Sequence, residues 1–154
     1  MSRTKIFLAS DHAGFKLKNK IKTYLEKDFE VEDCGAFEYD KNDDYPDFVI
    51  PCAKKVAQNK NSLGIIFGGS GQGEAIAANK VKGIRAVVFY GGNKKLIQLT
   101  KQHNDANILS LGARFLTEKE AIKIISLWLK TKFSNEERHV RRLRRTEEFE
   151  KGTR

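Results

Sequence analysis

Short apolar runs alternate along the chain with longer stretches whose apolar residues recur at helical spacing, and this alternation constrains the fold more than any other feature. The short runs have the length and the Ile, Leu, Val and Phe content of buried strands, and they cover residues 5–10, 29–33, 63–67, 85–89 and 108–111. The stretches with helical spacing cover residues 15–25, 48–58, 74–79 and 93–102. This alternation predicts a single Rossmann-like three-layer α/β/α domain with a mainly parallel five-stranded sheet.

The last third of the chain is predicted to be helical. Thr117 and Glu120 have the spacing of a capping box, in which each side chain binds the other residue's backbone N–H, and they open one helix. Ser134 and Glu137 have the same spacing and predict a C-terminal helix, within residues 134–154, that carries arginines. Because no linker, repeat or break in composition divides the chain, residues 1–154 are predicted to form one domain.

Composition excludes several classes of protein. No apolar run approaches the ~20 residues that a membrane span needs, and the first run is too short for the core of a signal peptide. Cys34 and Cys52 form neither a CxxC pair nor a disulfide framework, which favours a cytoplasmic location. With 3 His and 2 Cys, the chain has too few ligands at useful spacing for a structural zinc site.

The charge balance points to an anionic partner. The chain has 29 Lys and Arg against 20 Asp and Glu, a net charge of +9, which suits nucleic acid, an acidic membrane surface or a small anionic substrate. In doubly wound sheets, ligands bind beyond the carboxyl ends of the strands. The segments in which a site is expected are therefore residues 10–14, 68–74, 90–93 and 112–114.

The glycine-rich turn over residues 68–74 is the most informative of these segments. A strand that leads through such a turn into a helix presents backbone N–H groups to an anion. The turn lacks the spacing of a dinucleotide fingerprint, the Lys of a P-loop and the pattern of a nucleophile elbow. What it does offer is the hydroxyl of Ser70 and the carboxylate of Glu74. The alternative is a tight turn that only packs the helix on the strand, with Glu74 complementing the helix dipole.

Two polar clusters are weaker candidates. Asp11 and His12 follow the first strand, where a carboxylate beside an imidazole can orient a proton carrier, although Asp11 could equally cap the next helix. His103 and Asn104 end a predicted helix, where a histidine is often only a partner of the helix dipole.

The C-terminal helix carries an arginine face. Arg138, Arg141, Arg142 and Arg145 fall at i, i+3, i+4 and i+7, so they share one side of a helix that could bind phosphate through paired hydrogen bonds. The alternatives are a solvated face balanced by the glutamates that follow, or a nucleic-acid interface. Nucleic acid is not favoured, because no aromatic residues interleave with the arginines and no known binding module is present.

Together these motifs resemble a known family. Taken in order along the chain they are Ser10-Asp11-His12-Ala13-Gly14, Asp33-Cys34-Gly35, Asp44-Tyr45-Pro46, Gly68-Gly69-Ser70-Gly71-Gln72-Gly73-Glu74, Ala77-Ala78-Asn79-Lys80, Gly83-Ile84-Arg85, Gln102-His103-Asn104 and Arg138-His139. The chain is similar over almost its whole length to the B-type ribose-5-phosphate isomerases, within the family that they share with galactose-6-phosphate isomerase. The resemblance implies interconversion of an aldose phosphate and a ketose phosphate through a cis-enediolate, without metal or organic cofactor.

The resemblance also assigns roles in the chemistry. Many members have a cysteine base at the position of Gly69, whereas this chain resembles the subgroup in which a glutamate at the position of Glu74 is the base. The amides of Gly71 and Gly73 and the hydroxyl of Ser70 are expected to stabilise the enediolate. His103 corresponds to the acid that opens the sugar ring.

Other residues are implied to bind the substrate: Asp11 and Asn104 the sugar hydroxyls, Tyr45 the sugar pocket, and His12, Arg114, Arg138 and Arg142 the phosphate. In the family the site lies between two subunits, so a homodimer is expected, with a tetramer left open, and the C-terminal helix crosses to the partner. Ribose 5-phosphate and ribulose 5-phosphate are the leading substrates. A tetrose, allose or galactose phosphate is the alternative, and a basic nucleic-acid-binding module is the alternative outside enzymes.

Overall fold

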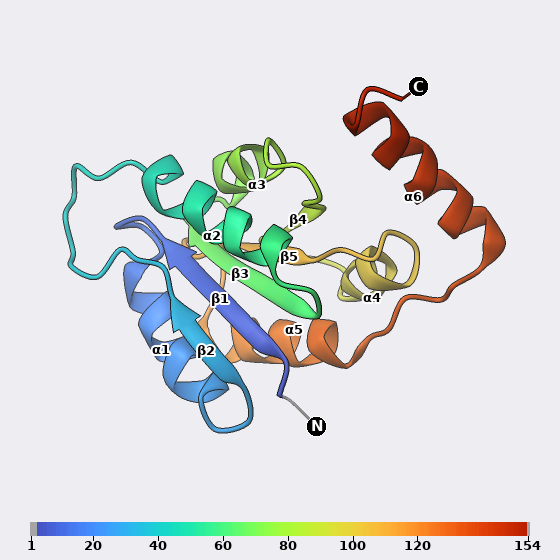
Figure 1. Cartoon of the computed structure of the whole chain (residues 1–154). Helices are drawn as coiled ribbons and strands as arrows, with labels where there is room; N and C mark the ends of the chain where they lie inside the picture. Colours follow the sequence, from blue (N-terminus) through green and yellow to red (C-terminus); the bar gives the residue numbers. More distant parts are fainter. Residues whose placement is uncertain (1–2, 154) are drawn as a thin grey trace.

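A computed structural model describes residues 3–153, and in this part of the chain one all-parallel sheet of five strands lies between helices on both of its faces (Figure 1). The strands are β1 (Lys5–Ser10), β2 (Glu30–Asp33), β3 (Ser62–Gly68), β4 (Ala86–Phe89) and β5 (Ile108–Gly112). They lie in the order β2-β1-β3-β5-β4. The predicted α/β class and sheet are confirmed, while residues 1, 2 and 154 of the predicted domain lie outside the described residues.

The helices agree with the predicted ones to within a few residues at their ends. They are α1 (Phe15–Leu25), α2 (Pro46–Gln58), α3 (Gln72–Ala78), α4 (Lys95–Gln102), α5 (Glu118–Lys130) and α6 (Glu137–Glu150). The start of α2 comes before the predicted residue 48 because Pro46 itself occupies the first turn, where the missing N–H of proline costs no hydrogen bond.

Both faces of the sheet are buried, which explains why the strands are continuously apolar. In β1, Ile6 and Leu8 join the core beneath α1, α4 and α5, whereas Phe7 and Ala9 join the core beneath α2 and α3. Successive strand residues point to opposite faces, so one strand supplies both cores. The larger core also contains Trp128 of α5, which is completely buried.

The two predicted capping boxes have different outcomes. At the start of α5, the hydroxyl of Thr117 accepts a hydrogen bond from the Glu120 N–H at 3.1 Å, and the Glu120 carboxylate accepts one from the Thr117 N–H at 2.8 Å. The predicted box of Ser134 and Glu137 is wrong. Asn135 has a positive φ of 58°, which turns the chain before the helix begins, and Ser134 accepts from Glu136 instead.

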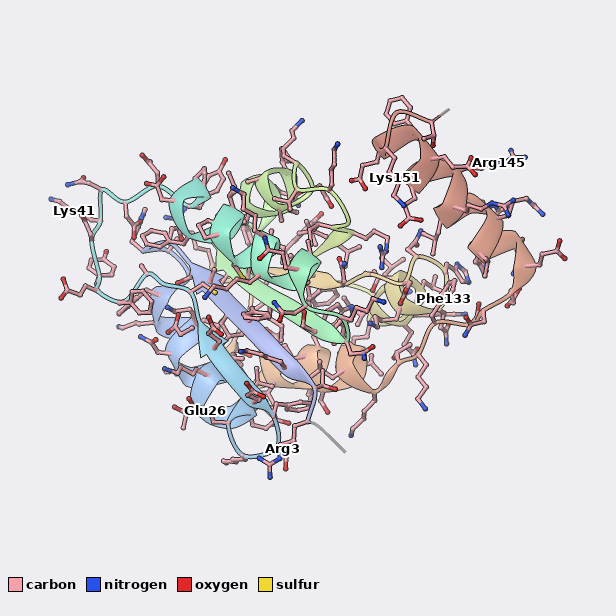
Figure 2. All side chains as sticks on the ribbon, in the orientation of Figure 1. Arg3, Glu26, Lys41, Phe133, Arg145 and Lys151 are labelled. Carbon is pink, nitrogen blue, oxygen red and sulfur yellow. The ribbon has the colours of Figure 1, made fainter. Side chains whose placement is uncertain are left out.

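The last helix, α6, contacts the rest of the domain through the stacked rings of His139 and His103 and through a hydrogen bond from the Gly83 N–H to the Glu150 carboxylate at 3.0 Å. Figure 1 shows that it follows an extended segment after α5 and projects away from the sheet. Most of its side chains are exposed, and Figure 2 places Arg145 on the side that faces away from the domain. Across residues 3–153, none of the helices combines the length and the apolar character needed to cross a membrane.

Candidate active site

A pocket of about 330 Å³ lies at the edge of the sheet where β1, β3 and β5 end. The segments that follow these three strands, together with the start of α2, form its wall. Its lining residues are Asp11, His12, Ala13, Tyr45, Gly69, Ser70, Gly73, Glu74 and Arg114. The pocket therefore brings together most of the predicted site residues at the edge where a doubly wound sheet binds ligands.

Hydrogen bonds from neighbouring strands hold the glycine-rich turn in place. Gly71 has a φ of 80°, a left-handed conformation that glycine adopts without strain, and its carbonyl accepts a hydrogen bond from the buried Ser110 hydroxyl at 2.7 Å. The segment after β5 is tied to the same turn, because the Arg114 N–H donates to the Gly69 carbonyl at 3.1 Å. Ser70 and Arg114 are thus fixed on two joined loops.

Glu74 is a buried carboxylate. Its side chain extends from the first turn of α3 and is only 4% exposed. Burial raises the pKa of the Glu74 carboxyl above its ordinary value, and the charge of Asp11 adds to the rise, while a backbone hydrogen bond and Arg114 act in the opposite direction. A solvated partner of the helix dipole would not be buried in this way. The environment instead suits a carboxylate that accepts a proton more readily than an ordinary glutamate does.

Gly68 makes the room for this carboxylate. A Cβ atom at Gly68 would lie 1.8 Å from Oε1 of Glu74, whereas a Cβ atom at Gly69 would lie 2.9 Å from the Arg114 guanidinium. A side chain that replaced the Glu74 carboxyl in space would therefore come from position 68. The expectation that position 69 holds the alternative base of the family does not fit this geometry.

The hydrogen bonds of Asp11 go to the turn that leads into α1, and the described structure shows none from Asp11 to His12. One of its carboxylate oxygens accepts hydrogen bonds from the N–H groups of Ala13 and Gly14, at 2.9 and 3.2 Å. These bonds shape the turn into α1, although the N-cap residue itself is Gly14. The Asp11 side chain also lines the pocket, and these hydrogen bonds hold it there.

His12 is held by Asp43, a residue that the motifs did not identify. Oδ1 of Asp43 accepts a hydrogen bond from the His12 backbone N–H at 2.9 Å and lies 2.7 Å from Nδ1 of the ring. The bond to Asp43 raises the pKa of His12, with a smaller contribution from the charge of Asp11, against opposing effects of burial and Arg114. Asp43 lies in a loop that also contains Asp40 and Asp44, and nothing in the sequence distinguishes it from them.

The same residues are the only described group in residues 3–153 whose carboxylate and imidazole atoms are close enough together to hold a metal ion. The ligand atoms of Asp11, His12 and Asp43 all lie within 4.8 Å of one another. However, Nδ1 of His12 and Oδ1 of Asp43 are at hydrogen-bond distance. A metal ion would have to replace that bond, so the geometry favours a hydrogen bond between the two side chains.

Tyr45 closes the pocket from the side of α2. It precedes Pro46 at the N-terminus of that helix, and its hydroxyl oxygen would lie 2.6 Å from a Cβ atom at Gly73. The aromatic ring therefore approaches the first turn of α3 so closely that only a glycine fits beneath it. This contact places a phenol next to the amides that begin α3.

The remaining predicted residues lie elsewhere. His103 follows α4, at the amino edge of the sheet, and its ring stacks on that of His139 at a centroid distance of 4.2 Å. Asn104 is the next residue, and Arg138 and Arg142 flank His139 on α6. Since β5 has 5 residues, roughly 16 Å of strand separates this edge from the pocket.

These residues form a second group with its own electrostatics. Burial lowers the pKa of His139, and the charges of His103, Arg138 and Arg142 lower it further, whereas Glu136 opposes them. The two arginine side chains are exposed. One chain therefore holds two separate groups: a carboxylate and histidine pocket at one edge, and a histidine and arginine group at the other.

Another hollow in the fold has a larger volume than the pocket but is not the candidate site. A hollow of about 460 Å³ lies near the amino edge, lined in part by Arg85, Lys101 and Asn107. It contains none of the predicted site residues. Two of its charged groups are engaged within the fold, since Lys101 donates to the Ala106 carbonyl at 3.1 Å and Arg85 to the Asp105 carbonyl at 2.9 Å.

Fold and pocket together define a class: a one-domain Rossmann-like protein with a buried carboxylate and cationic side chains around a small polar pocket. Comparison with known proteins identifies the family, because the model of the ribose/galactose isomerases matches residues 6–146. The chain belongs to the ribose/galactose isomerase family, and the predicted family is confirmed.

Individual relatives cover almost the whole chain. Ribose-5-phosphate isomerase B from Mycolicibacterium paratuberculosis is 43% identical over 148 residues, which are 96% of this chain and 92% of that protein. The solved ribose-5-phosphate isomerase B from Mycoplasma genitalium, with bound ribulose-5-phosphate, has a TM-score of 0.92 at 43% identity, with 98% of this chain and 99% of that chain covered. The enzyme from Clostridium thermocellum has a TM-score of 0.90 at 40% identity, covering 98% of this chain and 100% of that one.

Proposed function

We propose that the chain is an aldose–ketose isomerase that interconverts ribose 5-phosphate and ribulose 5-phosphate. The observation that carries this proposal is the buried Glu74 carboxylate, with its raised pKa, in a pocket that also contains a hydroxyl, an imidazole and a guanidinium group. The relatives named ribose-5-phosphate isomerase B, one of them with bound ribulose-5-phosphate, support the choice of substrate. The free thiols of Cys34 and Cys52 suit a cytoplasmic location for this activity.

Glu74 is the proposed base. Its carboxylate takes the proton from C2 of the open-chain aldose, which gives a cis-enediolate, and returns that proton to C1, while the hydroxyl proton on O2 moves to O1. Hydrogen is only relocated within the sugar, so the reaction needs no external electron acceptor. Negative charge builds up on the two oxygens between these steps. The Ser70 hydroxyl and the N–H groups of Gly71 and Gly73 are the proposed donors to them.

Two chains are proposed to complete each site. His12 and Arg114 of one chain bind the phosphate from the pocket, where Asp11 and Tyr45 contact the sugar. The partner's second group supplies what the pocket lacks: His103 as the acid for ring opening, Asn104 for a hydroxyl, and Arg138 and Arg142 for the phosphate. The separation of the two groups within one chain supports this arrangement, and so does the projection of α6 away from its own domain (Figure 1). A homodimer with two such sites follows from two-fold symmetry.

A panel of aldose phosphates tests the substrate. We expect kcat/KM for ribose 5-phosphate to exceed that for a tetrose or a hexose phosphate by at least about tenfold, since a chain one carbon shorter or longer misplaces the phosphate relative to Glu74. An enzyme-coupled or direct absorbance assay of the ketose measures each rate. A clear preference for allose or galactose phosphate would move the assignment to that substrate. No turnover of any member would contradict the isomerase itself.

A substitution at Gly68 tests the role of Glu74 as the base. Gly68→Ala places a methyl group where the carboxyl of Glu74 now lies. The carboxyl is the end of a flexible side chain, so the fold survives, but the base is displaced and kcat is expected to fall about 10- to 100-fold. Gly69→Ala is the matched control, because its methyl group meets the Arg114 guanidinium and is expected to raise KM more than it lowers kcat. Equal effects of the two variants on kcat would contradict the role of Glu74.

A further inference from the structure

The loop between β2 and α2 projects from the domain, with Lys41 at its outer end (Figure 2). Most of its side chains are exposed, yet the side chain of Asp43 is only 8% exposed. Asp43 turns back onto His12 and accepts hydrogen bonds from both its backbone N–H and its ring. Tyr39 of the same loop adds an edge-to-face contact with the His12 ring at 6.4 Å. Two residues of the loop, Tyr39 and Asp43, thus contact the side chain of His12.

We propose that Asp43 is a positioning residue that holds His12 as a cation, with Nε2–H available to the phosphate group of the substrate. Only the identity of the ligand as a sugar phosphate rests on the proposed function. The arrangement of His12 and Asp43 stands on the contacts between them.

The hydrogen bond determines which ring nitrogen faces a ligand. An ionised carboxylate can only accept hydrogen bonds, so Nδ1 of His12 carries the proton in the 2.7 Å contact with Asp43. Nε2 is then the nitrogen that remains for the pocket, which His12 lines together with Arg114. Oδ2 of Asp43 is buried without a hydrogen-bond partner in the described structure. Both hydrogen bonds that the Asp43 carboxylate accepts therefore come from His12, and its second oxygen stays buried and unpaired, which is unfavourable.

The charge of Asp43 matters because of the acidity of the ligand. A phosphate monoester becomes a dianion above about pH 6, and an ordinary imidazole loses its charge above about pH 6.5. Without help, His12 would become neutral over the range in which the substrate gains its second charge. The carboxylates of Asp43 and Asp11 act against this and Arg114 acts for it, with a net rise in the pKa of His12. Asp43 thereby keeps His12 cationic while the phosphate is a dianion.

The variant Asp43→Asn tests the charge and leaves the shape almost unchanged, because an amide oxygen can still accept from His12. Proton NMR titration is practical, since the chain has only 3 histidines and His12→Asn assigns the signal. We expect His12 to titrate at lower pH in Asp43→Asn than in the unmodified protein. At about pH 8, inorganic phosphate should bind roughly tenfold more weakly to the variant than to the unmodified protein. At about pH 5.5 it should bind equally well to both proteins, because His12 is charged in each of them.

Asp40→Asn is the matched control. It removes the same charge from the same loop. The Asp40 side chain accepts a hydrogen bond from the exposed Asn42 N–H, and the Asp40 backbone carbonyl, which the substitution keeps, accepts one from the Asp43 N–H at 3.1 Å. We expect it to change neither the titration of His12 nor the binding of phosphate. Unchanged titration of His12 in Asp43→Asn, or a loss of phosphate binding that is the same at both pH values, overturns the proposal.

The role of Asp43 can also be tested in the unmodified protein and without any enzymatic turnover. In the unmodified protein alone, a His12 that titrates at or below the ordinary imidazole pKa contradicts the proposal, whether or not the variant folds. Neither titration nor binding of inorganic phosphate needs turnover. An absence of isomerase activity would therefore count against the proposed function and leave the inference about Asp43 to be judged by these measurements.

Discussion

Glu74→Gln is expected to lower kcat by about 10³-fold, the usual scale for loss of a general base. Glutamine keeps the size and the hydrogen-bonding oxygen of glutamate, so the packing against Gly68 survives. What it loses is the ability to accept a proton from carbon. Because other residues are the proposed phosphate ligands, KM is expected to change much less than kcat.

In the unmodified protein, the pH dependence of kcat/KM should report the ionisation of Glu74. Glu74 acts as a base only when it is deprotonated, and burial raises its pKa. On the acid side, kcat/KM is therefore expected to fall as pH drops through this raised pKa, at a higher pH than for an ordinary glutamate. The control for the variant Glu74→Gln is Glu26→Gln, which makes the same change at the exposed end of α1. Full activity of Glu74→Gln, with the fold verified by circular dichroism, would remove Glu74 from the role of base.

Much of the fold was predictable because each strand carries its own signal. The strands are apolar on both faces, and the glycine-rich turn directly follows one of them, so the edge of the sheet that holds the pocket could be predicted without strand order. The order β2-β1-β3-β5-β4 was not predicted, because periodicity within a strand contains no information about its neighbours. The capping box predicted at Ser134 and Glu137 is absent for a similar reason. The spacing was correct, but the conformation of Asn135 decides whether the side chain can reach the helix.

The site was predictable where residues adjoin strands, and not where a loop folds back. Asp11, Ser70, Glu74 and Arg114 follow strand ends, so the fold brings them to one place. Asp43 reaches His12 from 31 residues away, through a loop whose path no local pattern describes. Gly68 is informative only once the Glu74 carboxyl is seen to fill the space above it.

The proposed division of the site between two chains predicts the second large effect, restoration of activity when two impaired variants are combined. One chain carries Glu74→Gln, and the other carries both Arg138→Ala and Arg142→Ala. Alone, the arginine variant should raise KM by at least about 10²-fold, because charge-assisted hydrogen bonds to phosphate are lost. In a heterodimer, one site combines Glu74 of the second chain with the arginines of the first, and this site is intact. The other site carries both defects.

Heterodimers purified through two different affinity tags should therefore have about half the activity of the unmodified dimer. The matched control replaces the arginine variant with Arg114→Ala. Arg114 and Glu74 line the same pocket of one chain, so a heterodimer of these two variants has one defect in each site and is expected to stay inactive. If α6 instead served its own chain, the first heterodimer would also carry one defect per site and would not recover. Rescue in the first pair and its absence in the second are both required, because only arginines donated across the dimer produce that difference.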